Sequence, residues 1–191
     1  MKTIALLGQP NSGKSTVFNQ LTGSHQHVGN WPGKTVEKKE GRFTHKGIKY
    51  QIADLPGSYG LTGNSDEEKI TVDYINSGKA DLVLILVDAS QLERSMFMLS
   101  EFARMDAPSV LLLNMADVAA SQNKTIDAGV LAERLGIPVM LFTAAESKGY
   151  EALKDLLAKE LSEPHKLKSA PEAHEDIKVS AKLKYEWIDK V

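Results

Sequence analysis

The sequence predicts an α/β protein with a mostly parallel six-stranded sheet that carries helices on both faces. Short apolar runs rich in leucine and β-branched residues, typical of buried strands, alternate with longer stretches that have apolar residues at helical spacing. A glycine-rich loop follows the first apolar run directly and precedes the first helical stretch. Right-handed crossovers between such strands produce a parallel sheet, and ligands bind at the carboxyl ends of its strands.

Six segments are predicted as strands. Five are apolar runs that end near Gly, Asp, Asn or Thr: residues 3–7, 49–53, 82–87, 110–113 and 138–142. The sixth, residues 36–45, is expected to lie at the sheet's edge as the antiparallel hairpin partner of residues 49–53.

Helices are predicted where apolar side chains share one face. One such face consists of Leu92, Met96, Leu99 and Ala103, and a second of Leu153, Leu156, Leu157 and Leu161. Ser65 and Glu68 have the spacing of a capping box, which predicts a helix start.

Two polar segments, residues 23–34 and 55–64, are rich in glycine and proline and are predicted to be mobile loops. Beyond Leu161 the sequence becomes polar and is interrupted by prolines. We therefore expect a main domain over residues 1–162 and a helical or disordered C-terminal extension over residues 163–191.

Composition excludes several classes of protein. A chain of 191 residues with 42% hydrophobic residues can form one domain with a substantial core. Its net charge of −2 disfavours nucleic acid and anionic membranes as partners. The lack of cysteine excludes disulfides and thiolate sites and fits a reducing cytoplasm. No apolar run is long enough for a signal peptide or a membrane span, so the chain as given is expected to be soluble.

The glycine-rich loop has the P-loop pattern. It consists of Gly8, Gln9, Pro10, Asn11, Ser12, Gly13, Lys14 and Ser15, followed by Thr16. In this pattern backbone N–H groups and a helix N-terminus bind the β-phosphate. Lys14 is then expected to reach the β- and γ-phosphates, and the Ser15 hydroxyl to bind magnesium. The alternative is a glycine-rich turn that matches by chance, and the flanking strand and helix argue against it.

Two more motifs follow predicted strands. In Asp54-Leu55-Pro56-Gly57 the carboxylate can hold a magnesium-bound water and the Gly57 amide can meet the γ-phosphate. In Asn114-Met115-Ala116-Asp117 the Asp117 carboxylate can accept from the N1–H and N2–H₂ of guanine, a donor pair that adenine lacks. Each motif alone is a common turn. Their order, each at a strand's end, predicts a P-loop nucleotide-binding domain with guanine preference, and it conflicts with an ATP-using kinase.

With these motifs the sequence resembles the Ras-like GTPases of the translation-factor-related class. The resemblance implies that Thr35 coordinates magnesium and contacts the γ-phosphate, with Gly33 and Lys34 beside it at the nucleotide. It also implies that Thr143, Ala144 and Ala145 form the loop that holds guanine through backbone N–H groups, with threonine in place of the usual serine.

Two strings narrow the resemblance to the ferrous iron transport protein B family, FeoB. They are VGNWPGKTVE at residues 28–37 and DLPGSYGL at residues 54–61, and the likeness extends over residues 2–161. The resemblance implies a G domain on the cytoplasmic face of the bacterial inner membrane. This domain would belong to a larger transporter, and GTP would regulate the uptake of ferrous iron by that transporter. A membrane domain and small accessory transport proteins are the implied partners, and the oligomeric state is left open.

The residue that orients the attacking water is not where the Ras-like pattern has it. Ser58 and Tyr59 follow Gly57, where a glutamine is usual. No arginine finger is evident, and four arginines stay open for that role: Arg42, Arg94, Arg104 and Arg134.

The resemblance supplies potassium as the missing positive charge. It implies that Asn11 and the backbone carbonyls of residues 29–31, with Gly29 and Trp31 among them, hold this ion. Asn11, Lys14, Thr35 and Gly57 are then the predicted catalytic residues, and turnover is expected to be slow and accelerated by potassium. Asn11 as a simple turn residue is the alternative.

Two further interpretations are less favoured. A stand-alone GTPase of ribosome assembly conflicts with the near-neutral charge and with the Asn-Trp-Pro-Gly loop. His25 and His27 could ligate iron, but no third ligand stands at a recognisable spacing, so solvated loop histidines are favoured.

Overall fold

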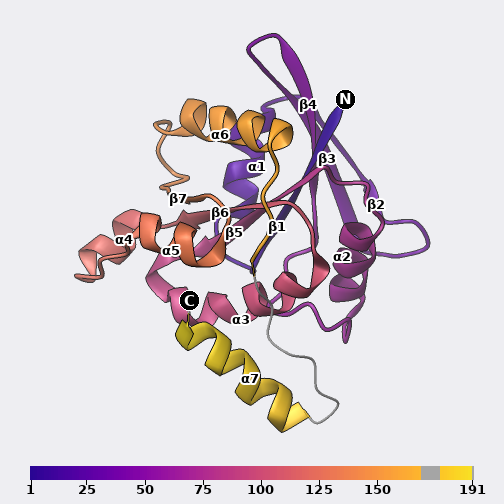
Figure 1. Cartoon of the computed structure of the whole chain (residues 1–191). Coiled ribbons are helices and arrows are strands. Elements are labelled where there is room, and N and C mark those ends of the chain that lie inside the picture. The colour runs from indigo at the N-terminus through magenta and orange to yellow at the C-terminus, as the bar shows by residue number, and fades with distance from the viewer. Residues whose placement is uncertain (169–176, 191) are drawn as a thin grey trace.

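The computed structural model describes residues 1–168 and 177–190. Its sheet has the strand order β2-β3-β4-β1-β5-β6-β7 (Figure 1). The strands are β1 (Lys2–Gly8), β2 (Gln26–Asn30), β3 (Glu37–His45), β4 (Ile48–Asp54), β5 (Leu82–Asp88), β6 (Ser109–Asn114) and β7 (Val139–Leu141). Parallel pairing joins β4, β1, β5, β6 and β7, whereas β3 pairs antiparallel with both β2 and β4. The predicted α/β class and the predicted hairpin are therefore confirmed.

The prediction of six strands needs one correction, because the described residues form seven. The additional strand, β2, lies within residues 23–34, which the sequence predicts as a loop. All five of its residues are exposed, and it pairs on one side only, from Gln26 opposite Gly41 to Asn30 opposite Glu37. Backbone pairing alone creates this strand, so no alternation of apolar and polar residues marks it in the sequence.

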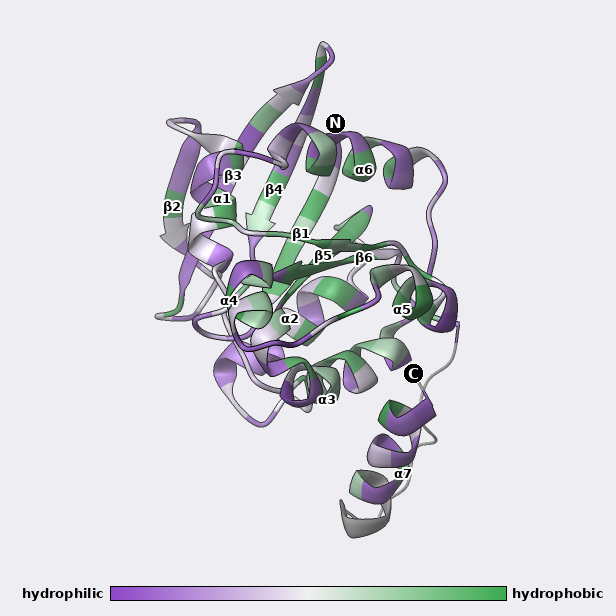
Figure 2. Cartoon of the chain, turned by 90° about the vertical axis from the view of Figure 1, so that its left-hand side faces the viewer, coloured by the Kyte–Doolittle hydropathy of each residue, from purple (hydrophilic) through white to green (hydrophobic). Residues whose placement is uncertain are grey.

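Helices cover both faces of the sheet. On one face lie α1 (Lys14–Thr22) and α6 (Tyr150–Ser162), and on the other lie α2 (Asp66–Asn76), α3 (Leu92–Phe102) and α5 (Ala128–Leu135) (Figure 1). Strand β5 contributes side chains to the core on each face of the sheet. Its even-numbered residues Leu82, Leu84 and Leu86 lie in the core under α1 and α6. Its odd-numbered residues Val83, Ile85 and Val87 lie in the core under α2, α3 and α5. A strand buried on both faces reads as a continuous apolar run, and Figure 2 shows β5 and β6 in green.

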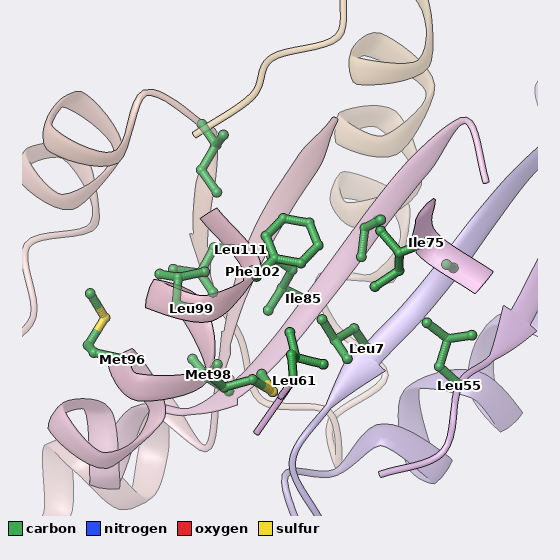
Figure 3. Close-up of a cluster of buried hydrophobic side chains, with 14 of the residues drawn as sticks. Leu7, Leu55, Leu61, Ile75, Ile85, Met96, Met98, Leu99, Phe102 and Leu111 are labelled. Atoms are coloured by element: carbon green, nitrogen blue, oxygen red, sulfur yellow. The ribbon is translucent and has the colours of Figure 1, made fainter. Parts of the chain in front are cut away.

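The core under α2, α3 and α5, called the second core below, includes part of the segment that follows β4. Leu55 and Leu61 pack with Leu7, Ile85 and Phe102 (Figure 3). Residues 55–64 were predicted as a mobile loop, yet two of their leucines are buried in this core, at 0% and 7% exposure. The burial of Leu55 and Leu61 therefore anchors this segment to the core at two points.

The predicted start of α2 is confirmed at Ser65, whose hydroxyl accepts a hydrogen bond from the Glu68 N–H at 3.1 Å. The reciprocal bond of a capping box is displaced by one residue. Glu68 Oε2 accepts from the Asn64 N–H at 3.1 Å and from the Thr62 hydroxyl at 2.8 Å. The carboxylate therefore closes the end of the preceding loop onto the helix.

Two helices remain. The short α4 (Ala116–Ser121) follows β6, and α7 (Ile177–Lys190) packs along α3, where Trp187 enters the second core (Figure 1). The predicted C-terminal extension is thus helical over residues 177–190, and residues 169–176 and 191 lie outside the described part. Over residues 1–168 and 177–190 we find no helix with the length and hydropathy needed to cross a bilayer.

Candidate functional site

The loop between β1 and α1 begins at the carboxyl end of β1. Asn11 and Gly13 have positive φ angles of 64° and 91°, and the Ser12 N–H donates to the Gln9 oxygen at 3.2 Å. Left-handed residues in such a loop turn successive N–H groups toward one side, which is the geometry of an anion-binding nest. A side chain at Gly13 would not fit, because its Cβ would lie 2.1 Å from Asn114 Nδ2.

A hollow of about 410 Å³ opens beside this loop. Its lining residues are Gln9, Pro10, Asn11, Gly13, Lys14, Ser15, Thr16, Gly57 and Met115. Each of them is among the residues that the sequence analysis assigns to nucleotide binding. The volume falls within the range of small-molecule sites.

Lys14 and Asp54 form the charged centre of the site. The Lys14 ammonium pairs with Asp54 Oδ1 and donates to the Leu55 oxygen at 2.8 Å, and both side chains are nearly buried. Burial raises the pKa of the Asp54 carboxyl, and the Lys14 charge opposes that shift. Lys14 therefore satisfies a carboxylate that would otherwise be costly to bury.

Asn114 joins three loops at the edge of the sheet. Its Nδ2 donates to the Ser12 oxygen at 2.8 Å, and its Oδ1 accepts from the Ala144 N–H at 2.8 Å. The Ala144 oxygen in turn accepts from the Tyr150 hydroxyl at 2.9 Å. The P-loop, the Asn114–Asp117 loop and the Thr143–Ala145 loop are thus brought together, as the motif order predicts.

Asp117 and its neighbours stand at the exposed side of this junction. Asp117 is exposed, and its Oδ1 lies 3.5 Å from the Thr143 hydroxyl. Ala145 is exposed as well, while Ala144 is buried. The carboxylate is thus free to accept from a ligand that occupies the space beside Thr143.

The segment that contains Thr35 lies elsewhere. The Trp31 ring is 7% exposed and packs edge-on against Tyr74 of α2, with ring centres 5.4 Å apart. Lys34 Nζ bonds Asp66 Oδ1 at 2.6 Å, and Thr35 is exposed. The turn that contains Gly33 is closed by the Lys34 N–H, which donates to the Trp31 oxygen at 3.0 Å. The structure does not bring these residues to the P-loop.

Gly29 is also separated from Asn11. It lies in β2, and two strands, β3 and β4, stand between β2 and β1. At the usual strand spacing this amounts to roughly 14 Å. The backbone carbonyls of Gly29 and Trp31 therefore do not meet the Asn11 side chain in this arrangement.

The donor chemistry fits one of the two implied ions directly. Ser15 and Asp54 offer a hydroxyl and a carboxylate, hard oxygen donors of the kind that magnesium prefers. The Asp54 carboxylate already binds one positive group, the Lys14 ammonium. For potassium, Asn11 offers an amide oxygen, whereas Gly29 lies in β2 and Trp31 lies in the following loop, packed against α2.

The two histidines weighed as iron ligands line a separate hollow of about 370 Å³ at the sheet's edge, together with Glu40 and Arg42. Within residues 1–168 and 177–190 no group of three or more His, Asp or Glu side chains is placed to hold a metal ion.

Two features of the site could not be read from the motifs. Tyr150 supports the Ala144 loop through its hydroxyl, and burial raises the pKa of Tyr150 to about 12. Arg94 of α3 lies 5.0 Å from the centre of the Tyr59 ring, in a hollow of about 170 Å³ that Pro10 and Asn11 also line. Arg94 is one of the four arginines that the sequence leaves open for catalysis, whereas no motif indicates Tyr150, the first residue of α6.

Of the other three arginines weighed for catalysis, Arg42 lies in the hollow with the histidines. Arg134 of α5 donates to the Lys190 oxygen at 3.3 Å. Arg104 follows α3 in the short 3-10 helix Ala103–Met105. None of these three lines the P-loop hollow.

Comparison with known proteins supports one family. Residues 2–157 match the family model described as ferrous iron transport protein B. The Fe(2+) transporter FeoB of Escherichia coli K12 is 47% identical over 156 residues, which are 80% of this chain and 20% of that protein. FeoB of Salmonella typhimurium LT2 has the same identity and coverage. The chain thus spans about a fifth of the length of these curated relatives.

Solved structures agree in fold. The apo cytosolic domain of the T. maritima FeoB iron transporter superimposes with a TM-score of 0.84 at 38% identity, over 94% of this chain and 71% of that one. The GMPPNP form of the same domain has the same values, and GDP form I has a TM-score of 0.82 at 41% identity, over 87% of this chain and 66% of that one. With the family model matched over most of its length, this chain belongs to the ferrous iron transport protein B family.

Proposed function

We propose that this chain binds GTP and hydrolyses it slowly, with acceleration by potassium, and that hydrolysis regulates ferrous iron transport by a larger protein. One observation carries the proposal: the hollow at the P-loop is lined by residues of the nucleotide motifs alone. The GMPPNP and GDP forms of the T. maritima FeoB domain support guanine nucleotides as the ligands.

Guanine selection is assigned to Asp117 and the Thr143–Ala145 loop. The exposed Asp117 carboxylate accepts from N1–H and N2–H₂ of the base, and the N–H of the exposed Ala145 binds the base from the Thr143–Ala145 loop, in which the Ala144 N–H is already bonded to Asn114. Asn114 is assigned to the nucleotide site as well. Its two buried bonds keep the base loop and the phosphate loop at a constant separation.

Phosphate binding draws Lys14 away from its resting partners. The ammonium exchanges Asp54 and the Leu55 oxygen for β- and γ-phosphate oxygens, and the N–H groups of residues 9–16 bind the β-phosphate. Asp54 would then be free to hold magnesium through a water, with Ser15 and Thr35 as the residues that would ligate the ion directly. When bound, magnesium neutralises charge on the β- and γ-phosphates.

Hydrolysis breaks the bond between the γ-phosphorus and the β–γ bridging oxygen as water adds, giving GDP and phosphate. Lys14 and the Gly57 N–H hold the γ-phosphate oxygens through this change. Asn11 and the carbonyls of Gly29 and Trp31 would hold potassium, which supplies the positive charge that an arginine gives in other GTPases. Slow turnover follows from the absence of a glutamine after Gly57.

The switch function rests on residues 23–36 and 55–64. For Thr35 to reach the nucleotide, residues 31–35 must leave α2, which breaks the Lys34–Asp66 ion pair and the Trp31–Tyr74 contact. The exposed ion pair opposes the nucleotide-bound state only by a modest amount, whereas exposing the buried Trp31 ring opposes it more strongly. Nucleotide binding and loop release are thus linked.

The rest of the proposal concerns the larger protein. Residues 1–162 form the GTPase domain on the cytoplasmic face of the bacterial inner membrane, and residues 163–191 belong to the helical domain that links it to a membrane transport domain. That domain and small accessory transport proteins are the proposed partners.

The test is GTP turnover in potassium chloride against sodium chloride at equal ionic strength. Potassium is expected to accelerate the unaltered chain, and Asn11→Ala to remove the acceleration. Asn123→Ala is the matched control, because Asn123 is also an asparagine at positive φ, 57°, and is exposed outside the site. Equal rates in both salts would refute the potassium mechanism, and equal binding of GTP and ATP would refute guanine selection.

A further inference from the structure

Glu101 on α3 forms a hydrogen bond to the segment that follows Gly57. Its Oε2 accepts from the Leu61 N–H at 2.6 Å. The Leu61 side chain is 7% exposed and packs in the core with Met98, Leu99 and Phe102 of the same helix (Figure 3). Backbone and side chain of Leu61 are therefore both held by α3.

The contacts follow one face of α3. Arg94, Met98 and Glu101 are spaced four and three residues apart, so their side chains lie along one side of the helix. The Arg94 guanidinium lies 5.0 Å from the Tyr59 ring centre, and Glu101 holds Leu61. The stretch 58–61 therefore rests lengthwise on this face.

The other carboxylate oxygen of Glu101 faces α7. Oε1 pairs with the ammonium of Lys184, and the two side chains are only 11% and 13% exposed. A Cβ built at Gly60 would lie 3.2 Å from Glu101 Oε2 and 3.3 Å from Glu68 Oε1, so two carboxylates crowd the same glycine. Lys184 supplies the positive charge that makes this crowding tolerable.

We infer that Glu101 is a positioning residue for GTP hydrolysis, and that Lys184 of α7 controls how firmly it holds Leu61. The inference rests on the proposed function, in which the Gly57 N–H meets the γ-phosphate. Leu61 is four residues beyond Gly57, so its anchor limits where Gly57 stands relative to the P-loop. A charged acceptor makes a stronger bond to an N–H group than a neutral one, and the Lys184 ammonium pairs with the other oxygen of the same carboxylate.

The test compares Glu101→Gln, Lys184→Met and the double variant in the full chain. Hydrogen exchange of the Leu61 amide measures the anchor directly, and kcat and KM for GTP measure its consequence. Glu93→Gln is the matched control, since Glu93 lies on the same helix and is exposed. The Ile85 amide, in the middle of β5, reports whether each variant keeps its core.

Glu101→Gln should raise Leu61 exchange about tenfold and lower kcat about threefold with KM nearly unchanged, because a charged hydrogen bond is replaced by a neutral one. Lys184→Met should move both quantities in the same direction by less, and it keeps the test available if Glu101→Gln unfolds. The double variant should match Glu101→Gln alone, because both changes act through one contact.

Two results would overturn the inference: Leu61 exchange in Glu101→Gln equal to that of Glu93→Gln, or effects of Glu101→Gln and Lys184→Met that add as independent changes. Absence of GTP turnover in the unaltered chain is a separate outcome, which refutes the proposed function. The exchange rates of Leu61 would then still decide whether Glu101 and Lys184 hold this segment together.

Discussion

The side chain of Asn114 donates to the main-chain oxygen of Ser12 at 2.8 Å, although the two residues are 102 positions apart in the sequence. Asn114 is 3% exposed and also accepts from the Ala144 N–H, so one amide side chain joins three loops. The amide side chain of Asn114 has both the donor and the acceptor that this geometry needs.

Asn114→Ala should therefore lower the free energy of unfolding by about 3 kcal/mol, because it leaves the Ser12 oxygen and the Ala144 N–H buried without partners. Urea denaturation measures this loss. Asn123→Ala, at an exposed asparagine, is the control and should stay within about 0.5 kcal/mol of the unaltered chain. A loss for Asn114→Ala no larger than that of the control would contradict the role given to its two bonds.

Gly13→Ala should be far more damaging than the same change at Gly78. Both glycines have positive φ, 91° and 67°. A Cβ at Gly13 would lie 2.1 Å from Asn114 Nδ2, whereas no atom lies within 4 Å of a Cβ at Gly78. Gly78→Ala should cost about 1 kcal/mol from backbone strain alone. Gly13→Ala should cost at least about 3 kcal/mol, because Asn114 must also move. Thermal unfolding of the two variants side by side gives the comparison, and equal midpoints would show that the close approach does not matter.

Trp31 should report departure of residues 31–35 from α2. The chain has two tryptophans, so Trp187→Phe leaves Trp31 as the only indole emitter. Trp31 is buried against Tyr74, and its Nε1 has no hydrogen-bond partner. GMPPNP with magnesium should shift its emission to longer wavelength and raise its quenching by acrylamide, because the ring becomes exposed to water. In Trp31→Phe the emission of Trp187 should not respond, and an unchanged Trp31 spectrum would argue against release of this segment.

Tyr150 should give the chain a pH dependence at the alkaline end. Burial raises the pKa of Tyr150 from 10.0 to about 12, so the folded chain retains the phenol proton over a range in which the unfolded chain loses it. The stabilising contribution is fully present below pH 10 and is lost as the pH rises from about 10 to about 12. Urea unfolding at several pH values should reveal this decline in the unaltered chain and a shallower one in Tyr150→Phe. An identical slope in both would mean that another group is responsible.

Much of the fold could be predicted because its signals are local. The run Leu82–Val87 is apolar throughout since both faces of β5 are covered, and Ser65 caps α2 as its spacing with Glu68 predicts. By contrast β2 has no apolar pattern, because it is exposed and its strand character comes from pairing with β3 alone. Pairing through main-chain groups alone leaves no pattern in the side chains of β2.

The sequence by itself determined the class of the protein, the P-loop and the residues of the Asp54–Gly57 and Asn114–Asp117 motifs, because each rests on contiguous residues whose chemistry and spacing are readable. Only the tertiary structure decided that Lys14 pairs with Asp54 and that Trp31 packs against α2. It also decided that Glu101 joins Leu61 to Lys184. These contacts join elements that are 40 to 83 residues apart. The order of strands in the sheet and the packing of helices on it set such distances, and no local pattern encodes them.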